Sequence, residues 1–399
     1  MRVLISAGGT AGHVLPALAV LKALKAMTPP KSSAAMSGSK AASSNGADFP
    51  PPAGGQGIQA LFVGEQDGME RELARRDGVD FTAIHAGAVH GVGLRRAARG
   101  ILRLAMGTVK ALRIIGGFRP DVVLLTGGFV GVPVSAAAWL RRVPSVVYLP
   151  DIEPGLALKA MARLARRVAT TTEASAPYIP ASKMVVTGYP VRDAFRGVTR
   201  ESARAGMGIP ADAEVVLAFG GSKGARSINR AVLAALPHFM SRSGLVLIQV
   251  TGSADWPEVQ AAREALPDAQ QARYLAFPYL HEDMAEAMAA ADLVVCRSGA
   301  STLGELPALG LPAVLVPYPH AWRYQKVNAR YLAERGAAVM IEDAQLNEAS
   351  GGLWQAVAGL LDDPARLGAM REAARRLGGR DGAREIAEVV LRVARHDGR

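Results

Sequence analysis

One pattern constrains the fold of this chain more than any other: a short apolar strand, a turn of small residues, and then a periodic helix. It is clearest between Asp292 and Asn328. Leu293–Cys296 has the length and β-branched content of a buried strand, and a second strand is expected at Ala313–Val316. The turn between strand and helix, Arg297–Thr302, is small and hydroxylated. Parallel strands bring such turns to their carboxyl edge, where ligands bind in open α/β sheets.

This turn is a candidate anion site. The first backbone N–H groups of a helix lack internal partners, and the helix dipole adds positive potential at the same end. Glu305 lies one turn into the helix, and Gln325 lies in the polar loop after the next strand. We therefore expect Glu305 and Gln325 to converge on one ligand.

The same plan recurs along the chain, which at 399 residues is long for a single core. Glycine-rich turns at 8–13, 126–129 and 220–225 follow expected strands, and the alternation begins afresh after 188–192. Helices are expected at Val14–Met27, with Pro16 in the first turn, and at Met69–Arg76. We predict two α/β/α domains that face each other across a cleft. The turn at 8–13 is not GxGxxG, and no acidic residue ends the following strand, so a dinucleotide fingerprint is rejected.

Composition narrows the class of protein. The chain is 50% hydrophobic and 20% charged, has no apolar run near 18 residues, and begins directly with a strand rather than a signal peptide. Its one cysteine, Cys296, excludes an internal disulfide and suits a reducing compartment. The net charge of +11 favours anionic partners. Aromatic residues are few and no nucleic-acid module is recognised, so nucleic acid is not an expected partner.

Two segments differ from the alternating pattern. Residues 28–57 are rich in Ser, Ala, Gly and Pro and are predicted to be a disordered insertion. Residues 86–120 contain no acidic residue, and a helical projection gathers six cations within roughly 100° of arc. The cations are Arg95, Arg96, Arg99, Arg103, Lys110 and Arg113, with Leu94, Ile101, Ala105 and Leu112 on the opposite side. This face is either an ordinary solvated surface or a surface that docks on anionic lipid; Gly100 and Gly107 argue against one unbroken helix.

Five motifs, in this order, resemble the MurG family. They are GGTAGHVLPALA at 8–19, TGGFVGVP at 126–133, TGYPVR at 187–192, FGGSKGARSIN at 219–229 and SGASTLGELPALGLPAVLVPYP at 298–319. Members of this family transfer N-acetylglucosamine from UDP-GlcNAc to an undecaprenyl-diphosphate-linked muramyl-pentapeptide in peptidoglycan synthesis. The resemblance implies an α/β GT-B fold with two Rossmann-like domains, here 1–189 with the final helix 383–399, and 190–382. It also implies a peripheral enzyme on the cytoplasmic face of the cell membrane, attached here through the basic 94–115 region.

The resemblance assigns roles to residues of the second domain. Glu305 matches the carboxylate that accepts both ribose hydroxyls, and Gln325 matches a side chain on the donor sugar. Leu280 falls where backbone pairs with the uracil edge, and Ser222 matches a serine that hydrogen-bonds the diphosphate. The phosphate-binding helix start corresponds to Ala300, Ser301 and Thr302.

The remaining matched positions lie outside that domain or at its border. Thr10, Ala11 and Gly12 match the loop that reaches the donor sugar and diphosphate, and Arg192 matches the arginine at the domain junction. Asp151 stands where the family has an asparagine that contacts the donor sugar. Tyr324 and Tyr189 also depart from the family pattern, so these changes concern the acceptor and the sugar rather than the nucleotide.

We predict an inverting displacement at the anomeric carbon, with UDP leaving and neither a metal nor a cofactor required. The diphosphate is already a good leaving group, and fixed backbone dipoles with Ser222 can meet its growing charge. His13 is the first candidate for the base and Asp151 the second; His13 is as readily explained as a ligand of the acceptor diphosphate. Alternatives are another GT-B glycolipid transferase, a UDP-GlcNAc 2-epimerase, and a UDP-sugar-binding protein that has lost transfer.

Overall fold

The computed structural model describes residues 1–9, 11–29, 57–66, 68–84, 94–221, 224–281, 283–320, 324–347 and 352–396. The predicted insertion at 28–57 lies outside the described residues except at its two ends. The chain forms two compact units: unit 1 comprises residues 1–150, 154–190 and 381–399, and unit 2 comprises 151–153 and 191–380. Within the described ranges, no helix is both long enough and apolar enough to cross a membrane.

Unit 1 is built on a sheet whose strands are all parallel, in the order β3-β2-β1-β4-β5-β6-β7. Its strands are β1 Arg2–Ser6, β2 Gln59–Gly64, β3 Asp80–Ala83, β4 Val122–Leu125, β5 Ser145–Leu149, β6 Arg167–Thr170 and β7 Met184–Val186. Its helices are α1 Ala11–Met27, α2 Met69–Arg76, α3 Leu94–Phe118, α4 Gly131–Leu140, α5 Leu156–Leu164 and α15 Gly382–His396, with a 3-10 turn at Glu173–Ser175. Central strands such as β4 and β5 are buried along their whole length, as the apolar runs predict for a parallel sheet covered on both faces.

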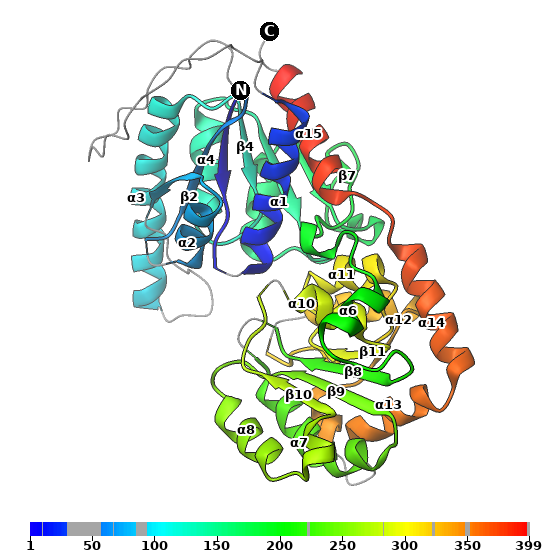
Figure 1. The fold of residues 1–399 in the computed structure, drawn as a ribbon. Helices are drawn as coiled ribbons and strands as arrows, with labels where there is room; N and C mark the ends of the chain where they lie inside the picture. The colour runs from blue at the N-terminus through cyan, green and yellow to red at the C-terminus, as the bar shows by residue number, and fades with distance from the viewer. Residues whose placement is uncertain are drawn as a thin grey trace, which may run out of the picture. The chain divides into compact units, whose positions relative to one another are not determined.

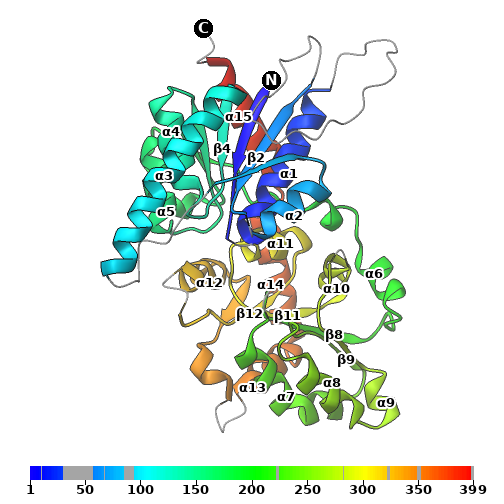
Figure 2. The ribbon, with the colours of Figure 1, turned by 90° about the vertical axis from the view of Figure 1, so that its left-hand side faces the viewer.

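The helices of unit 1 lie on two sides of this sheet. α1 and α15 pack side by side on one face, although they come from opposite ends of the chain, and α3, α4 and α5 cover the other (Figures 1 and 2). α1 begins at Ala11, three residues before the predicted start, so that Gly12 and His13 belong to its first turn. The prediction of Pro16 in the first turn was wrong for that reason, and the proline removes the usual helical donor to the carbonyl of Gly12.

α3 is one continuous helix, so the expected break at its glycines does not occur. Gly107 lies on the buried side of α3, and α3 packs against α4. The buried stripe consists of Ala111, Ile114, Ile115 and Phe118, whereas Ala105, expected on the covered side, is exposed. The covered face is therefore displaced around the helix from the predicted one, because α4 rather than the leucine spacing decides which side is buried.

Unit 2 repeats this architecture with a parallel sheet in the order β10-β9-β8-β11-β12-β13. Its strands are β8 Glu214–Phe219, β9 Leu245–Val250, β10 Tyr274–Phe277, β11 Leu293–Cys296, β12 Ala313–Leu315 and β13 Ala338–Met340. Its helices are α6 Arg200–Gly206, α7 Arg226–Ser241, α8 Trp256–Glu264, α9 Asp268–Gln271, α10 Met284–Ala290, α11 Thr302–Leu309, α12 Tyr324–Glu334, α13 Gly352–Leu361 and α14 Pro364–Leu377, with 3-10 turns at Asp193–Phe195 and Asp343–Asn347. α7, α8 and α13 lie on one face of the sheet, and α10 and α11 on the other (Figure 2).

Both sheets reverse their strand order at one point, between β1 and β4 in unit 1 and between β8 and β11 in unit 2. Helices that follow two strands flanking such a point leave on opposite faces, which opens a crevice at the carboxyl edge where ligands bind. The turns that follow these four strands are the glycine-rich or small-residue turns of the sequence. The topology therefore pairs these turns within each unit.

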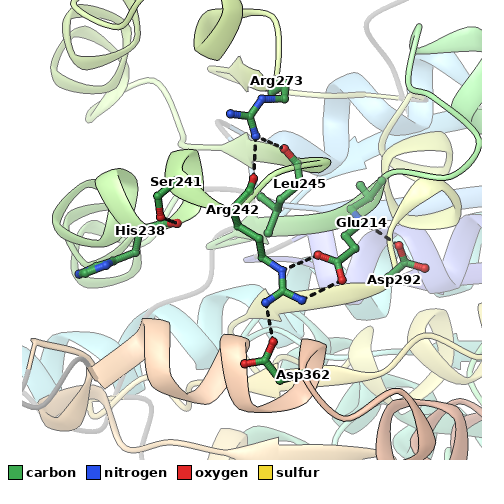
Figure 3. Close-up of polar contacts among 9 residues, drawn as sticks. Glu214, His238, Ser241, Arg242, Leu245, Arg273, Asp292 and Asp362 are labelled. Atoms are coloured by element: carbon green, nitrogen blue, oxygen red, sulfur yellow. Dashed lines mark hydrogen bonds and ion pairs between the residues drawn. The ribbon is translucent and has the colours of Figure 1, made fainter.

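The opposite edge of the unit 2 sheet is held by an arginine network (Figure 3). Arg242, directly after α7, donates from Nη2 to Oε1 of Glu214 at 2.9 Å and from Nη1 to Asp362 at 2.6 Å. These two carboxylates raise the pKa of the Arg242 guanidinium. Arg273 donates to the backbone oxygens of Arg242 and Leu245 at 2.9 and 3.0 Å. This network joins α7, β8, β9 and the α13–α14 connection on the edge away from the candidate site.

Candidate active site

The first element of the candidate site in unit 2 is the turn between β11 and α11. Thr302 begins α11 and donates from Oγ1 to the carbonyl of Gly299 at 2.7 Å, which closes the turn. Ala300 and Ser301 occupy this turn, as predicted from the motif, and no side chain caps the helix at Ser301. The N–H groups of Thr302–Glu305 bond to backbone carbonyls of the turn, so the amino end of α11 attracts an anion mainly through the positive end of the helix dipole.

Glu305 is buried one turn into α11, and it is paired with Arg192. The guanidinium Nη2 lies 3.1 Å from Oε1 of Glu305, and Nε lies 3.3 Å from the same oxygen. Arg192 also stacks over the ring of Phe195, with Cζ 4.9 Å from the ring centroid. Arg192 is thus held on the α11 side of unit 2 by two contacts, one ionic and one aromatic.

Burial and the ion pair act on the Glu305 carboxyl in opposite directions. Loss of solvent raises its pKa above the ordinary value of 4.5, while the charge of Arg192 and the hydrogen bond from Ser301 lower it. Burial is the larger effect, so the pKa of Glu305 is raised. The same carboxylate contributes to a raised pKa of the buried Cys296 thiol, for which burial is the main cause. A buried carboxylate needs hydrogen-bond donors around it, so Glu305 offers acceptor oxygens to a ligand that carries hydroxyl or N–H groups.

A buried asparagine on α12 connects the next group of residues. Asn328 has no exposed surface and donates from Nδ2 to Asp151 Oδ1 at 2.8 Å and to the carbonyl of Ser298 at 3.2 Å. Its Oδ1 accepts from the backbone N–H of Ile152 at 3.2 Å. The loop after β5 is therefore fixed to the β11 turn through one side chain. Asp151 is positioned by this amide.

Gln325 lies one turn before Asn328 on the same helix. Its Oε1 accepts from the backbone N–H of Tyr318 at 2.9 Å, and its carbonyl accepts from Ser298 Oγ at 2.8 Å. Tyr324 precedes it, and its pKa is raised first by burial and then by the charges of Glu153 and Asp151. Gln325, Asn328 and Asp151 thus meet around Ser298 at the end of β11. The convergence of Gln325 and Glu305 on one ligand stays a prediction.

Arg297 holds the same turn in place through three contacts. It donates to Oγ of Ser227 at 2.7 Å, forms an ion pair with Asp343, and reaches the carbonyl of Val316 at 3.2 Å. Ser227 in turn donates to Asp343 at 2.7 Å. The start of α7, the end of β12 and the turn after β13 are therefore held together around the β11 turn.

The glycine turn after β8 lies beside that turn because β8 and β11 are neighbours. Gly224 has φ +75°, and a Cβ at this position would lie 2.2 Å from the carbonyl oxygen of Thr251. Asn229 on α7 donates to the same carbonyl at 2.8 Å and to Asp255 at 2.8 Å. Glycine is required here because the turn passes directly against β9. Ser222 lies outside the described residues.

In unit 1, the turns after β1 and β4 pack directly against each other. Thr126 donates from Oγ1 to the carbonyl of His13 at 2.7 Å, and the His13 ring lies over Gly127. A Cβ on Gly127, which has φ +137°, would be 2.4 Å from His13 Cδ2; a Cβ on Gly128 would be 2.6 Å from the carbonyl oxygen of Gly8. The two glycines therefore decide how closely His13 and the first turn approach β4.

A buried carboxylate supports the first of these turns. Glu70 on α2 is 1% exposed, and its Oε1 accepts from the N–H of Glu65 at 2.9 Å. Side chains at Gly8, Gly64 or Gly68 would collide with it, since their Cβ atoms would lie 3.1, 2.5 and 2.3 Å from its atoms. Three backbone segments converge on Glu70 because all three carry glycine.

The predicted site residues fall into groups. Ala300–Thr302 and Glu305 lie at the start of α11, and Arg192 pairs with Glu305. Asp151 bonds to Asn328, and Gln325 lies one turn before Asn328 and bonds to Ser298. Gly12 and His13 lie in the first turn of α1, next to Ala11, while Thr10 lies outside the described residues. Leu280 is half-buried in the loop after β10. Asn328, Arg297 and Glu70 were missed; the three-residue spacing between Gln325 and Asn328 on one helix was a usable signal for the first of them.

Comparison with known proteins gives the family. Residues 215–390 match the Glycosyltransferase family 28 C-terminal domain, and residues 54–170 match the N-terminal domain of that family. The UDP-N-acetylglucosamine--N-acetylmuramyl-(pentapeptide) pyrophosphoryl-undecaprenol N-acetylglucosamine transferase of Roseiflexus sp. (strain RS-1) is 41% identical over 97% of this chain and 94% of its own length. The transferase of that name from Desulforudis audaxviator (strain MP104C) is 39% identical over 99% of both chains.

Solved structures agree with these matches. The crystal structure of Acinetobacter baumannii MurG is similar with a TM-score of 0.73 and 26% identity, covering 98% of this chain and 99% of that one. UDP-GlcNAc 2-epimerase from Neisseria meningitidis, bound to UDP-GlcNAc, shares the fold with a TM-score of 0.63 at 14% identity, covering 98% of this chain and 100% of that one. The predicted α/β GT-B fold class, with two parallel Rossmann-like sheets, is confirmed. The chain is a member of the MurG family within glycosyltransferase family 28.

Proposed function

We propose that this chain transfers N-acetylglucosamine from UDP-GlcNAc to the undecaprenyl-diphosphate-linked muramyl-pentapeptide, converting lipid I to lipid II in peptidoglycan synthesis. The observation that carries the proposal is the buried Glu305 carboxylate one turn into α11, a helix whose amino end has no side-chain cap. The two hydroxyls of a ribose are two donors, which suits a carboxylate, and a diphosphate suits the amino end of the helix. Relatives at 39% and 41% identity carry the name of this transferase.

The donor is assigned to unit 2. Glu305 accepts the ribose hydroxyls, the Ala300–Thr302 turn and Ser222 receive the diphosphate, and Leu280 presents backbone to the uracil edge. Gln325 and Asp151 contact the sugar, and Asn328 fixes Asp151 at 2.8 Å. Arg192 is the one cation in direct contact with Glu305 among the described residues, and it is 28% exposed. It is therefore available to a negatively charged ligand.

The acceptor is assigned to the first turns of unit 1, where the resemblance gives Thr10, Ala11 and Gly12 a role toward the donor sugar and diphosphate. Displacement at the anomeric carbon releases UDP, whose charge is met by fixed backbone donors. His13 is the first candidate for the base that takes the acceptor proton, and its position over Gly127 gives it a defined orientation. Asp151 is the second candidate. A base in this role contributes about 10²–10⁴-fold to the rate.

Among the alternatives, an epimerase has a specific observation behind it, because several UDP-GlcNAc 2-epimerases share the fold. Their identity to this chain is only 12–14%, and at that level likeness extends to the fold alone. The transferase relatives are far more similar. Transfer is therefore the proposal we adopt.

Attachment to an anionic membrane surface is the second part of the proposal. On α3, Arg103, Lys110 and Arg113 are exposed together with Met106 and Val109, which are 53% and 50% exposed. A helix face that mixes cations with apolar side chains suits the boundary between lipid headgroups and acyl chains. The side chains of Arg95, Arg96 and Arg99 lie outside the described ones.

A cationic cavity of about 570 Å³ on the same unit supports this attachment. Five of its lining residues are cations, and Trp139, which is 60% exposed, stands at its border. The cations are Arg142, Arg163, Arg166, Arg167 and Lys183. Arg141, next to this cavity, lies beside Gly116 of α3, which places the end of α3 against the end of α4. An anionic headgroup fits such a surface.

A transfer assay with a panel of UDP-sugars and lipid-diphosphate acceptors tests the proposed function. We expect product from UDP-GlcNAc and lipid I, little from other UDP-hexoses, and none from a soluble sugar acceptor. Formation of UDP-ManNAc from UDP-GlcNAc without acceptor would make the protein an epimerase. Stabilisation by UDP without product under any condition would leave a UDP-sugar-binding protein.

A further inference from the structure

A groove beside α14 of unit 2 is not used by the proposed reaction. It has a volume of about 400 Å³ and runs between α14, the end of α12 and β13. Its floor is apolar and small, formed by Ala338, Val339, Met370 and Ala373. Three arginines border it, Arg335, Arg366 and Arg376, and the lining residues include no carboxylate.

The spacing along α14 gives the groove its shape. Arg366, Ala369, Ala373 and Arg376 recur at three or four residues, so they share one face of the helix. The two arginines are separated by ten residues, which is about 15 Å along an α-helix. Between them, the alanines leave the space open, and a Cβ at Gly336 would lie 3.8 Å from that of Ala373. The groove is therefore elongated, with a cation at each end and a narrow apolar middle.

Two of these arginines, Arg366 and Arg376, differ from the arginines of unit 2 that form ion pairs. Six other arginines of the unit pair with carboxylates: Arg204 and Arg371 with Asp292, Arg226 with Asp255, Arg242 with Glu214, Arg297 with Asp343 and Arg375 with Glu372. Within the described residues, Arg366 and Arg376 form no ion pair, and Arg335 stacks over Tyr331 with Cζ 3.7 Å from the ring centroid. Arg366 and Arg376 thus bring to the groove positive charge that no carboxylate in the described part of the unit pairs with.

The third wall of the groove is an edge strand. β13 is the last strand of the unit 2 sheet, paired only with β12 in the described part of the chain. An edge strand presents backbone donors and acceptors to which an extended segment can add. An extended chain advances about 3.3 Å per residue, so four residues span about 13 Å and return to the same face. Acidic side chains at that spacing match the separation of Arg366 and Arg376.

We propose that this groove binds an extended acidic segment of a partner protein, laid along α14 beside β13, with small apolar side chains over Ala373 and acidic ones on the arginines. Charge complementarity selects the acidic segment, and the elongated shape with an open strand edge favours a peptide over a compact anion. The proposal is independent of which sugar or acceptor the enzyme uses.

The test is fluorescence anisotropy with the full-length protein and a labelled nonapeptide that has two glutamates four residues apart, a valine midway between them, and serine at the other positions. We expect micromolar binding that weakens with salt, and at least tenfold weaker binding by the double variant Arg366→Glu/Arg376→Glu. The variant Arg230→Glu/Arg330→Glu changes the net charge equally at exposed positions of unit 2 that do not line the groove, and it is expected to bind within twofold of wild type. Ala369→Trp fills the groove at an exposed position without changing charge, and it is also expected to weaken binding.

Unchanged UDP-induced stabilisation and thermal unfolding serve to show that each variant is folded. Equal loss in the two double variants would overturn the proposal, since the chain carries a net charge of +11 and would then attract the peptide without a site. Full binding by Ala369→Trp would also overturn it. A third result would also overturn it: with UDP at saturation, the protein binds inorganic pyrophosphate stoichiometrically but does not bind the peptide. The groove would then be a site for a small anion.

Discussion

Arg192 and Glu305 lie 113 residues apart in the chain, yet the guanidinium Nη2 is 3.1 Å from Oε1 of the carboxylate. The carboxylate side chain is 11% exposed and the arginine 28%. Burial makes the ionisation of Glu305 unfavourable, and the charge of the partly exposed Arg192 offsets part of that free-energy cost. A ligand that brings its own hydroxyl donors to Glu305 and its own negative charge to Arg192 can replace this pair contact by contact.

Binding of UDP is expected to depend on the ionisation of Glu305. Its raised pKa means that protonation begins at a higher pH than for an ordinary glutamate with a pKa of 4.5. UDP affinity should accordingly fall as the pH is lowered toward and through this raised pKa. Glu305→Gln should bind UDP about 10- to 100-fold more weakly at neutral pH, because a hydrogen bond to a charged group is worth about 1.5–3 kcal/mol. Its affinity should be flat over the same pH range, and calorimetry from pH 4.5 to 8 measures both.

The stability of the ligand-free protein should depend on the ionisation of Glu305 in the opposite sense to UDP affinity. The folded pKa of Glu305 lies above the unfolded value, so the protonated carboxyl favours folding and that contribution is lost as pH rises through the folded pKa. The melting temperature of Glu305→Gln, relative to wild type, is therefore expected to increase as pH rises above 4.5. Melting curves of the two proteins that stay parallel across this range would contradict a raised pKa.

Replacing Gly127 by alanine should disturb His13 without affecting the nucleotide site. The added Cβ would lie 2.4 Å from His13 Cδ2, on a backbone with φ +137°. We expect a loss of stability of about 1–3 kcal/mol from backbone strain, a fall in kcat, and unchanged UDP affinity. Gly78→Ala is the matched control, because Gly78 has φ +64° and nothing within 4 Å of its Cβ position. If turnover falls equally in both variants, strain in unit 1 rather than the position of His13 accounts for the effect.

The elements of this fold follow from local sequence, and several were predictable to the residue. The helix Met69–Arg76 and the strand Leu293–Cys296 have the expected bounds, because apolar periodicity is a local property. The start of α1 was missed by three residues, since Ala11–His13 carries no apolar spacing that distinguishes a helix from a turn. The buried side of α3 was displaced because packing against α4 decided it.

The site was predictable as motifs but not as contacts. Glu305 and Gln325 could be placed at one sheet edge because parallel strands end together. The bond from Asn328 to Asp151 joins positions 177 residues apart, and no pattern within either segment contains it. The close approach of Gly127 to His13 likewise depends on β1 and β4 being neighbours, which is a property of sheet order.

Asp151→Asn is expected to keep the fold while changing chemistry. The amide oxygen of the new side chain can still accept from Asn328 Nδ2, which lies 2.8 Å from Oδ1 of Asp151. If Asp151 takes the acceptor proton, kcat should fall by about 10²–10⁴-fold with little change in UDP affinity. A His13→Ala variant measured beside it identifies the base, since only one of the two should show the larger loss. Near-normal turnover in both would remove general-base catalysis by these residues.

Asn328→Ala tests the positioning of the same loop. Removing the amide leaves the Ile152 N–H and the Ser298 carbonyl without their buried partner, and each such loss costs about 1–3 kcal/mol. We expect lower stability and a higher KM for the donor. Asn328→Asp keeps the acceptor for Ile152 but places a carboxylate beside Asp151, so it should be worse than alanine at neutral pH and recover as pH is lowered. Equal defects at all pH values would argue against this contact.

Membrane attachment through α3 can be separated from overall charge because unit 1 carries cations on both sides of its sheet. Neutralising the exposed Arg103, Lys110 and Arg113 to glutamine should weaken sedimentation with anionic vesicles by about 100-fold, at about 1 kcal/mol for each cation near the surface. The matched control changes Lys25, Arg71 and Arg75 to glutamine. These residues are exposed on α1 and α2, and replacing them removes the same amount of charge. Met106→Ser with Val109→Ser should weaken binding further without changing its salt dependence, because it removes apolar contact only. Equal losses in the two charge variants would assign the attraction to net charge, and α3 would then be an ordinary solvated surface.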